Sequence, residues 1–156
     1  MADAVRTERV ERAMELFNSG YNCAQATLCA FRDVIDADEK LLKRVASDFG
    51  GGMSGTRETC GAVTGMLMAL GLIRGYDDVT DTEHKQRLYA EGRSLIEDFT
   101  AEFSTVTCAE LSGNIARSFK EKPHELVGEG LFRPCTAFVA YATALLDAHI
   151  KTTGAE

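Results

Sequence analysis

Apolar residues recur along most of the chain with the spacing of an amphipathic α-helix. Residues 7–17 carry them at i, i+3, i+4 and i+7, which places them on one face of a helix. Similar spacing predicts a second helix after Asn22, a residue type that caps helices, with its apolar stripe continuing to residue 35. A short helix is predicted over residues 38–46. The alternation of apolar and polar residues that marks a strand appears nowhere. The pattern therefore predicts an all-α fold.

The segment over residues 56–73 is apolar around most of its helical circumference. Since such a helix has to be covered on all sides, we expect it at the centre of the fold. The predicted elements that follow are a long helix over residues 82–103, a short turn over 108–111, a polar stretch over 113–130 and a last helix. Pro134 begins this last helix, because its fixed φ and missing N–H suit the first helical position. With no linker and no internal repeat, residues 1–156 are predicted to form a single-domain bundle of about five to six helices.

Composition narrows the classes of protein to consider. Lys and Arg number 17 against 24 Asp and Glu, a net charge of -7, which argues against binding to nucleic acid. The longest apolar stretch, residues 62–73, is too short for a membrane span, which needs about 20 residues. Residues 1–11 lack the apolar region of a signal peptide. We therefore expect a cytoplasmic protein without membrane insertion, in which cysteines are reduced, metal-bound or catalytic.

Four of the five cysteines lie where predicted helices begin, namely Cys23, Cys60, Cys108 and Cys135. The partial positive charge at a helix N-terminus favours a thiolate over a thiol. We therefore expect at least one of Cys60 and Cys135 to have a pKa below that of an ordinary thiol. Helical spacing directs both sulfurs toward the interior of the bundle, while Cys29 shares the polar side of its helix and is left out of the site. The alternative for each cysteine is a small apolar filler of the core.

Residues 50–55 contain four glycines and form a predicted loop before the central helix. Glycine-rich loops can bring backbone N–H groups close to an anionic ligand at the start of a helix. We therefore assign Gly50, Gly51, Gly52 and Gly61 to ligand binding, with a tight interhelical loop as the alternative. The Gly-Lys-Ser/Thr ending of a nucleotide-binding P-loop is absent, so nucleotide binding is not expected.

Several short motifs together resemble one known family. They are Tyr21-Asn22-Cys23-Ala24-Gln25, Gly50-Gly51-Gly52, Cys60-Gly61-Ala62-Val63-Thr64-Gly65, and the single residues Cys108 and Cys135. This set is similar to the family called C_GCAxxG_C_C, whose members are described as "putative redox-active proteins", and the similarity extends over about residues 20–146. The resemblance implies a redox role for the four matching cysteines.

A domain similar to this one occurs in split-Soret cytochromes, where an iron–sulfur site has been proposed for it. The resemblance therefore implies that an iron–sulfur cluster is one cofactor to consider. Haem is not expected, because the chain has no Cys-x-x-Cys-His motif for c-type attachment.

Three functions remain open at this point. The first is an electron-transfer protein in which Cys23, Cys60, Cys108 and Cys135 hold an iron–sulfur cluster or zinc, since four thiolates match the ligand count of either. The second is a thiol–disulfide oxidoreductase in which two of these cysteines cycle. The third is a structural zinc-binding or purely packed helical binding module without redox activity. We favour a cysteine-based redox protein with an unknown redox partner protein, and a homodimer is compatible with a small bundle.

Overall fold

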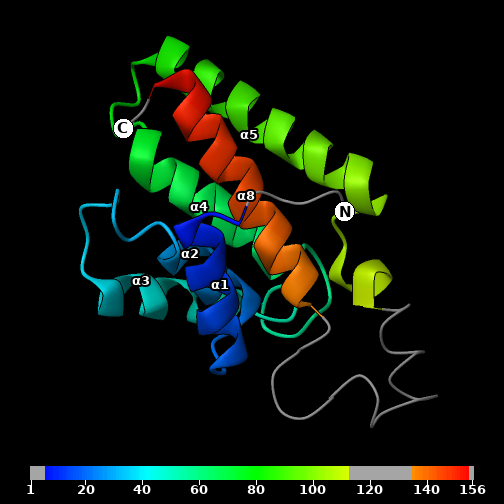
Figure 1. Ribbon diagram of the computed structural model, residues 1–156. Coiled ribbons are helices and arrows are strands. Elements are labelled where there is room, and N and C mark those ends of the chain that lie inside the picture. The colour runs from blue at the N-terminus through cyan, green and yellow to red at the C-terminus, as the bar shows by residue number, and fades with distance from the viewer. Residues whose placement is uncertain (1–5, 113–134, 155–156) are drawn as a thin grey trace, which may run out of the picture.

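The computed structural model describes residues 6–112 and 135–154, and helices make up most of these two ranges. The elements are α1 (Glu8–Asn18), α2 (Cys23–Cys29), α3 (Glu39–Ala46), the 3-10 helix η1 (Ser47–Phe49), α4 (Gly61–Arg74), α5 (Thr82–Phe103) and α8 (Thr136–Thr153) (Figure 1). The β-structure within the described residues is a single antiparallel bridge between Thr59 and Thr107. The all-α prediction is therefore confirmed. None of the helices described is both long enough and apolar enough to cross a membrane.

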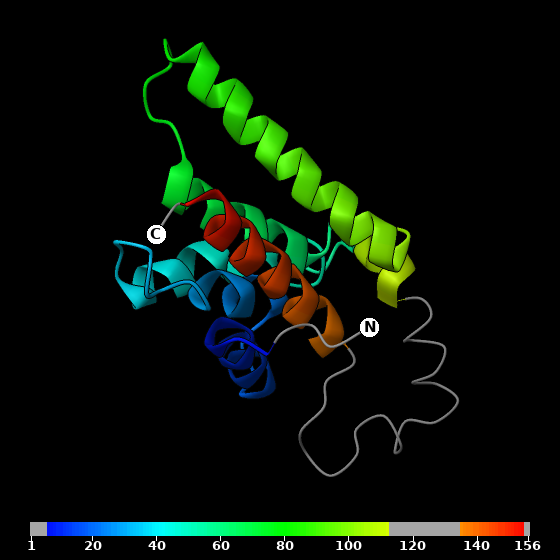
Figure 2. The same cartoon turned by 45° about the horizontal axis from the view of Figure 1, so that its top comes forward.

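The helices are arranged in three layers. Figure 2 shows α4 and α8 in the middle, α1, α2 and α3 on one side, and the long α5 on the other. The largest packing surfaces join α2 to α4 and α1 to α8. Because α4 also packs against α8 and α5, it occupies the central position expected from its apolar circumference.

Two glycines let α4 approach α2 closely. A Cβ atom on Gly65 would lie 2.6 Å from the carbonyl oxygen of Ala24, and one on Gly61 would lie 3.2 Å from the Cβ atom of Cys23. Real Cβ atoms essentially never approach other atoms as closely as 2.6 Å. The absence of side chains at these two positions therefore sets the separation of the two helices.

The start of α2 is fixed by reciprocal hydrogen bonds between Asn22 and Gln25. The Gln25 N–H donates to Oδ1 of Asn22 at 2.9 Å, and the Asn22 N–H donates to Oε1 of Gln25 at 3.1 Å. This is a capping box, in which each side chain satisfies a backbone N–H that the helix leaves without a partner. Gln25 also donates to the carbonyl oxygen of Lys43 at 2.9 Å, which ties α2 to α3. These bonds hold Cys23 as the first residue of α2.

Two helix boundaries differ from those predicted. The central helix begins at Gly61 rather than near residue 56, because Met53, Ser54 and Arg57 adopt left-handed backbone conformations with φ of 68°, 53° and 66°. α2 ends at Cys29, and turns replace the predicted helix over residues 30–34. The prediction for residues 82–103 is confirmed by α5. Residues 108–112 are helical, as expected for the short turn, while Pro134 and the polar stretch over 113–130 lie outside the described residues.

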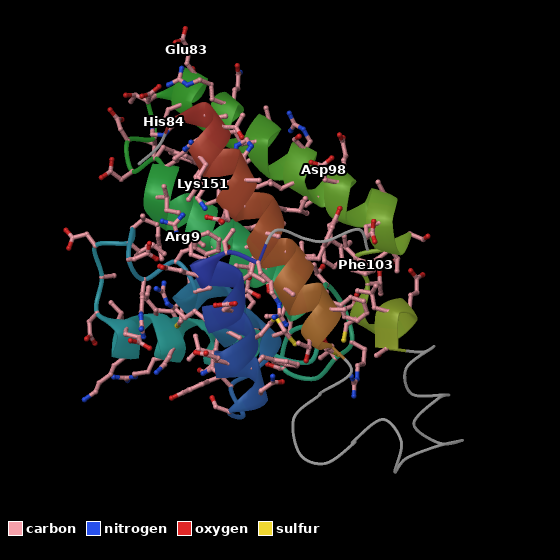
Figure 3. The ribbon with its side chains drawn as sticks, in the orientation of Figure 1. Arg9, Glu83, His84, Asp98, Phe103 and Lys151 are labelled. Atoms are coloured by element: carbon pink, nitrogen blue, oxygen red, sulfur yellow. The ribbon has the colours of Figure 1, made fainter. Side chains whose placement is uncertain are left out.

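An aromatic cluster joins α5 to the first turns of α8. The rings of Phe103 and Phe138 meet edge to face with centroids 4.9 Å apart, and Phe103 meets Tyr141 in the same way at 5.3 Å. Figure 3 places Phe103 at the end of α5 that lies next to the start of α8. Edge-to-face pairs add to the stabilisation from burial, so the cluster anchors this end of α8, where Cys135 stands.

Candidate functional site

Cys60 is the N-cap residue of α4, and only 4% of its surface is exposed. Burial raises the pKa of the Cys60 thiol to about 12, because an apolar environment disfavours the charged thiolate. The N–H groups of Ala62 and Val63 lie near the sulfur and act in the opposite direction, although neither forms a regular capping hydrogen bond with it. The expectation of a lowered pKa is therefore wrong for Cys60, since burial outweighs the helix terminus.

Cys23 and Cys135 lie close enough to Cys60 to influence its ionisation. Negative charge on either thiol raises the pKa of Cys60 further, and Cys23 has the larger effect of the two. Cys23 is the first residue of α2 and Cys135 the N-cap residue of α8, and both are partly exposed. The structure therefore brings three of the four predicted cysteines together where α2, α4 and α8 begin.

The fourth predicted cysteine, Cys108, is tied to the segment before α4 by the bridge between Thr59 and Thr107. The Cys60 N–H donates to the carbonyl oxygen of Val106 at 2.8 Å, and the Cys108 N–H donates to that of Glu58 at 2.6 Å. Side chains alternate between the two faces of such a pairing, so residues 60 and 108 belong to one face as diagonal neighbours. This pairing keeps the backbone of Cys108 close to the segment that carries Cys60, and Cys108 is partly exposed.

Arg57 is a residue of this site that the sequence did not reveal. Its Nη1 atom lies 3.9 Å from the Sγ atom of Cys108. The position of the Arg57 guanidinium depends on the left-handed backbone of Arg57 itself, with φ of 66°. Nothing in the sequence pattern indicates that conformation.

The glycine loop, residues 50–55, packs against Asn22, which precedes Cys23, and against Cys108. A Cβ atom on Gly50 would lie 2.7 Å from the Cβ atom of Asn22, and one on Gly52 would lie 2.6 Å from the Cβ atom of Cys108. Gly51 and Gly52 also have φ of 63° and 70°, a region that favours glycine. The assignment of Gly50, Gly51, Gly52 and Gly61 to ligand binding stays a prediction. Close packing already accounts for the missing side chains at positions 50, 52 and 61.

The N–H groups of residues 53–58 donate to carbonyl oxygens within residues 48–53. The second half of the loop is therefore held in place by backbone hydrogen bonds to the first half. It holds Arg57 and Glu58, the two residues whose carbonyl oxygens accept from Ala109 and Cys108. The loop thus fixes the position of Cys108 relative to α4.

Cys29 lies apart from the other cysteines, at the last residue of α2. It is fully buried rather than on a polar face, because α3 packs against that side of α2. Burial raises the pKa of Cys29 to about 11, Glu39 raises it further, and Lys43 and Arg32 lower it. Its charged neighbours belong to the α3 side of α2, and its exclusion from the site stays a prediction.

A metal or cluster would need several ligand side chains that converge on one point. Among the residues that the structure describes, no group of three or more His, Cys, Asp or Glu side chains is arranged to hold a metal ion. In the geometry described here, the four cysteines therefore do not form a ligand set, and an iron–sulfur cluster or zinc stays a prediction.

Comparison with known proteins gives one family match. The model of the C_GCAxxG_C_C family, described as "Putative redox-active protein", matches residues 21–149. An "Uncharacterized protein" of Archaeoglobus fulgidus is 25% identical to the chain, and the alignment covers 97% of each of the two proteins. No solved structure matches the chain.

Proposed function

Because the chain belongs to the C_GCAxxG_C_C family of "putative redox-active" proteins, we propose that it is a cysteine-based redox protein that exchanges thiols for a disulfide. In this proposal Cys23 and Cys60 form the exchanging pair. The observation that supports the pair is the close packing of Cys23 against Gly61, the residue after Cys60: a Cβ atom on Gly61 would lie 3.2 Å from the Cβ atom of Cys23. The larger effect of Cys23 than of Cys135 on the pKa of Cys60 supports the same choice.

The proposed reaction is thiol–disulfide exchange with a disulfide of a partner protein or small molecule. The thiolate of Cys23, which is partly exposed, attacks one sulfur of that disulfide and forms a mixed disulfide, while the other sulfur leaves as a thiolate. The thiol of Cys60 then loses its proton and attacks Cys23, which releases the second sulfur of the partner. The partner gains two electrons and two protons and becomes a dithiol, and the protein retains a Cys23–Cys60 disulfide.

The raised pKa of Cys60 suits the second step of this reaction. While Cys23 is a thiolate, its charge and burial both keep Cys60 protonated. Formation of the mixed disulfide removes the charge on Cys23, so one cause of the raised pKa disappears. The N–H groups of Ala62 and Val63 remain and favour the thiolate. Formation of the mixed disulfide therefore favours ionisation of Cys60, while burial, the largest cause of its raised pKa, remains.

Cys135 offers the alternative partner for Cys60, because it also raises the pKa of that thiol. In that case Cys135 would take the role of the attacking thiol, since it is partly exposed as well. Cys108 has Arg57 beside it and lies at the edge of the site, where it could pass a disulfide onward to Cys60.

A redox titration of the full chain tests the proposal. The reduced protein is equilibrated in glutathione buffers of graded potential, and the number of thiols is read from the intact mass after alkylation. The proposal predicts one two-electron transition that Cys23→Ser and Cys60→Ser abolish, whereas the matched variant Cys29→Ser retains it. Metal analysis of the same anaerobically purified sample separates the alternatives. A bound metal or cluster released only by acid or chelator would contradict thiol–disulfide exchange, and thiols that never oxidise would support the purely packed module.

A further inference from the structure

A groove of about 290 Å³ lies between α4 and α5, on a face of the molecule that the cysteine site does not use. Its walls are apolar, with Leu67 and Leu70 from α4 and Leu88 and Ile96 from α5. Gly71 also lines it, and no atom lies within 4 Å of the place that a Cβ atom on Gly71 would take. A helical glycine with open space above it leaves a hollow that most other residues would fill.

One positively charged side chain lines this hollow, and a second lies nearby. Arg93 lines the groove, is exposed, and makes no ion pair with any residue in the described ranges 6–112 and 135–154. Tyr89 lines the groove as well, and Nζ of Lys85 lies 5.5 Å from the centroid of its ring. The protein as a whole carries a net charge of -7, so two cations beside an apolar groove stand out from the average surface. The combination favours a ligand that is apolar along its body and negatively charged at one end.

We propose that the groove binds a small amphipathic anion, an apolar body with one acidic head group. The body would lie against the leucine side chains of α4 and α5, and the head group near the guanidinium of Arg93. The size of the groove, at the lower end of the range for small-molecule sites, suits a single ring system or a medium-length alkyl chain.

The charges on the rim disfavour a second copy of this chain as the occupant. Two-fold symmetry places the same surface of both copies at the interface. A dimer formed on this groove would therefore bring Arg93 and Lys85 of one copy close to the same two residues of the other. Like charges repel, and the groove is concave on both copies, so the two surfaces do not complement each other.

Two fluorescent probes that share an apolar ring system test the proposal. 1-Anilinonaphthalene-8-sulfonate carries a sulfonate, and N-phenyl-1-naphthylamine is the same skeleton without it. We expect the anionic probe to bind the folded protein saturably and more tightly than the neutral one. Amide shifts in a proton–nitrogen NMR spectrum should map to α4 and α5, which excludes binding to a partly unfolded state.

Three variants locate the site. Gly71→Leu should abolish binding of both probes, because its side chain fills the hollow, while the protein stays folded since this position is open. Arg93→Gln should weaken the sulfonate probe by about fivefold and leave the neutral probe unchanged. Arg87→Gln removes a charge from the same helix without lining this groove, so it should change neither affinity.

The proposal is overturned if Gly71→Leu leaves binding of the anionic probe intact, or if both probes bind equally well to the unaltered protein. Light scattering provides the test for a second copy. A dimeric mass that Gly71→Leu converts to a monomeric one would show that another chain occupies the groove, which contradicts the proposed ligand.

Discussion

A Cβ atom placed on Gly61 would lie 3.2 Å from the Cβ atom of Cys23. The two residues belong to different helices, and their contact brings the start of α2 against the start of α4. Because Cys60 directly precedes Gly61, the same contact brings Cys23 to Cys60. The Cys-Gly pair of the central motif thus has a physical meaning: the cysteine supplies the sulfur, and the glycine makes room for the second cysteine.

Replacing Gly65 by alanine should lower the free energy of unfolding. The new Cβ atom would lie 2.6 Å from the carbonyl oxygen of Ala24, so α2 and α4 have to separate. Overpacking of this kind costs about 1–3 kcal/mol, against the roughly 1 kcal/mol that alanine gains over glycine within a helix. Gly71→Ala is the matched control, since its Cβ atom meets nothing within 4 Å, and it should stabilise the protein by up to about 1 kcal/mol. Equal stability of the two variants in denaturant titrations would show that α2 and α4 are not in such close contact.

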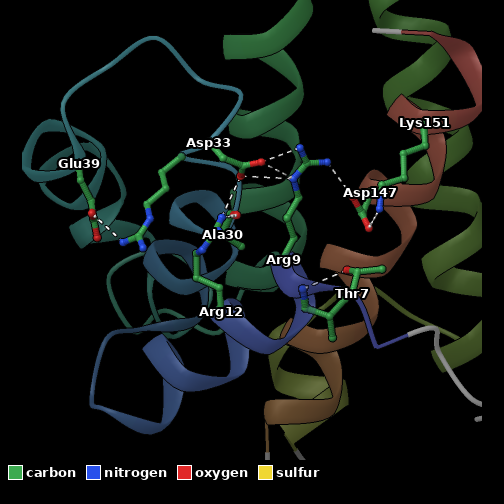
Figure 4. Close-up of polar contacts among 10 residues, drawn as sticks. Thr7, Arg9, Arg12, Ala30, Asp33, Glu39, Asp147 and Lys151 are labelled. Atoms are coloured by element: carbon green, nitrogen blue, oxygen red, sulfur yellow. Dashed lines mark hydrogen bonds and ion pairs between the residues drawn. The ribbon is translucent and has the colours of Figure 1, made fainter. Parts of the chain in front are cut away.

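A buried ion pair between α1 and the C-terminal half of α8 should contribute more to the stability of the protein than any ion pair on the surface. Nη1 of Arg9 lies 2.7 Å from Oδ1 of Asp147, and their side chains are 8% and 2% exposed (Figure 4). Asp147→Asn removes the carboxylate from this pair. Arg9 keeps Asp33 at 2.7 Å, so the cost is that of the lost charged hydrogen bonds, about 1.5–3 kcal/mol. As a control, Glu83→Gln removes an exposed pair with Arg87 and should change stability by less than about 0.5 kcal/mol. Thermal unfolding of both variants measures the difference, and similar losses would contradict the role of the buried pair.

Acid should destabilise the protein through the same carboxylate. Burial alone would raise the pKa of Asp147, but hydrogen bonds from Lys151, Arg9 and Thr7 outweigh it and lower the pKa below the ordinary value of 3.8. The group binds a proton more readily in the unfolded chain, so its contribution to stability is complete above pH 3.8 and is lost as the pH falls through the lower folded-state pKa. Unfolding midpoints measured between pH 7 and pH 2.5 should therefore decline less steeply for Asp147→Asn than for the unaltered protein. Parallel curves would show that Asp147 is not the group responsible.

Much of the fold could be predicted from local patterns, because helices form from residues that are close in sequence. The bounds of α5 and the central place of α4 followed from periodicity alone. The start of α4 could not be predicted, since left-handed conformations at Met53 and Arg57 are uncommon for these residue types.

The location of cysteines at helix starts could be predicted from the sequence, but their ionisation could not. Helical position indicated which sulfurs point inward, yet the degree of burial depends on neighbouring helices that are distant in sequence. Burial reverses the expected effect of the helix terminus on Cys60. For the same reason the sequence places Cys29 on a polar side of its helix, whereas α3 covers that side in the fold.

Alkylation rates should separate the cysteines into two groups in the reduced native protein. Cys60 and Cys29 are buried, and their pKa values are raised to about 12 and about 11, so few of these thiols are ionised near pH 8. The partly exposed Cys23, Cys108 and Cys135 should react with iodoacetamide first. Mass spectrometry of peptides after timed quenching assigns each rate, with the unfolded protein as the reference for equal reactivity. Early labelling of Cys60 would contradict the burial on which its role in the second step of exchange depends.

The most direct test of the central claim is the identity of the first disulfide that forms. The reduced protein is oxidised with a limiting amount of glutathione disulfide, and the reaction is stopped with acid. The remaining thiols are then alkylated, and the linked peptides are identified by mass spectrometry. The account predicts that Cys23 and Cys60 are linked in the major two-electron product, with Cys29 still reduced. A product that lacks Cys60, or one in which Cys29 is oxidised as readily as Cys23, would contradict it.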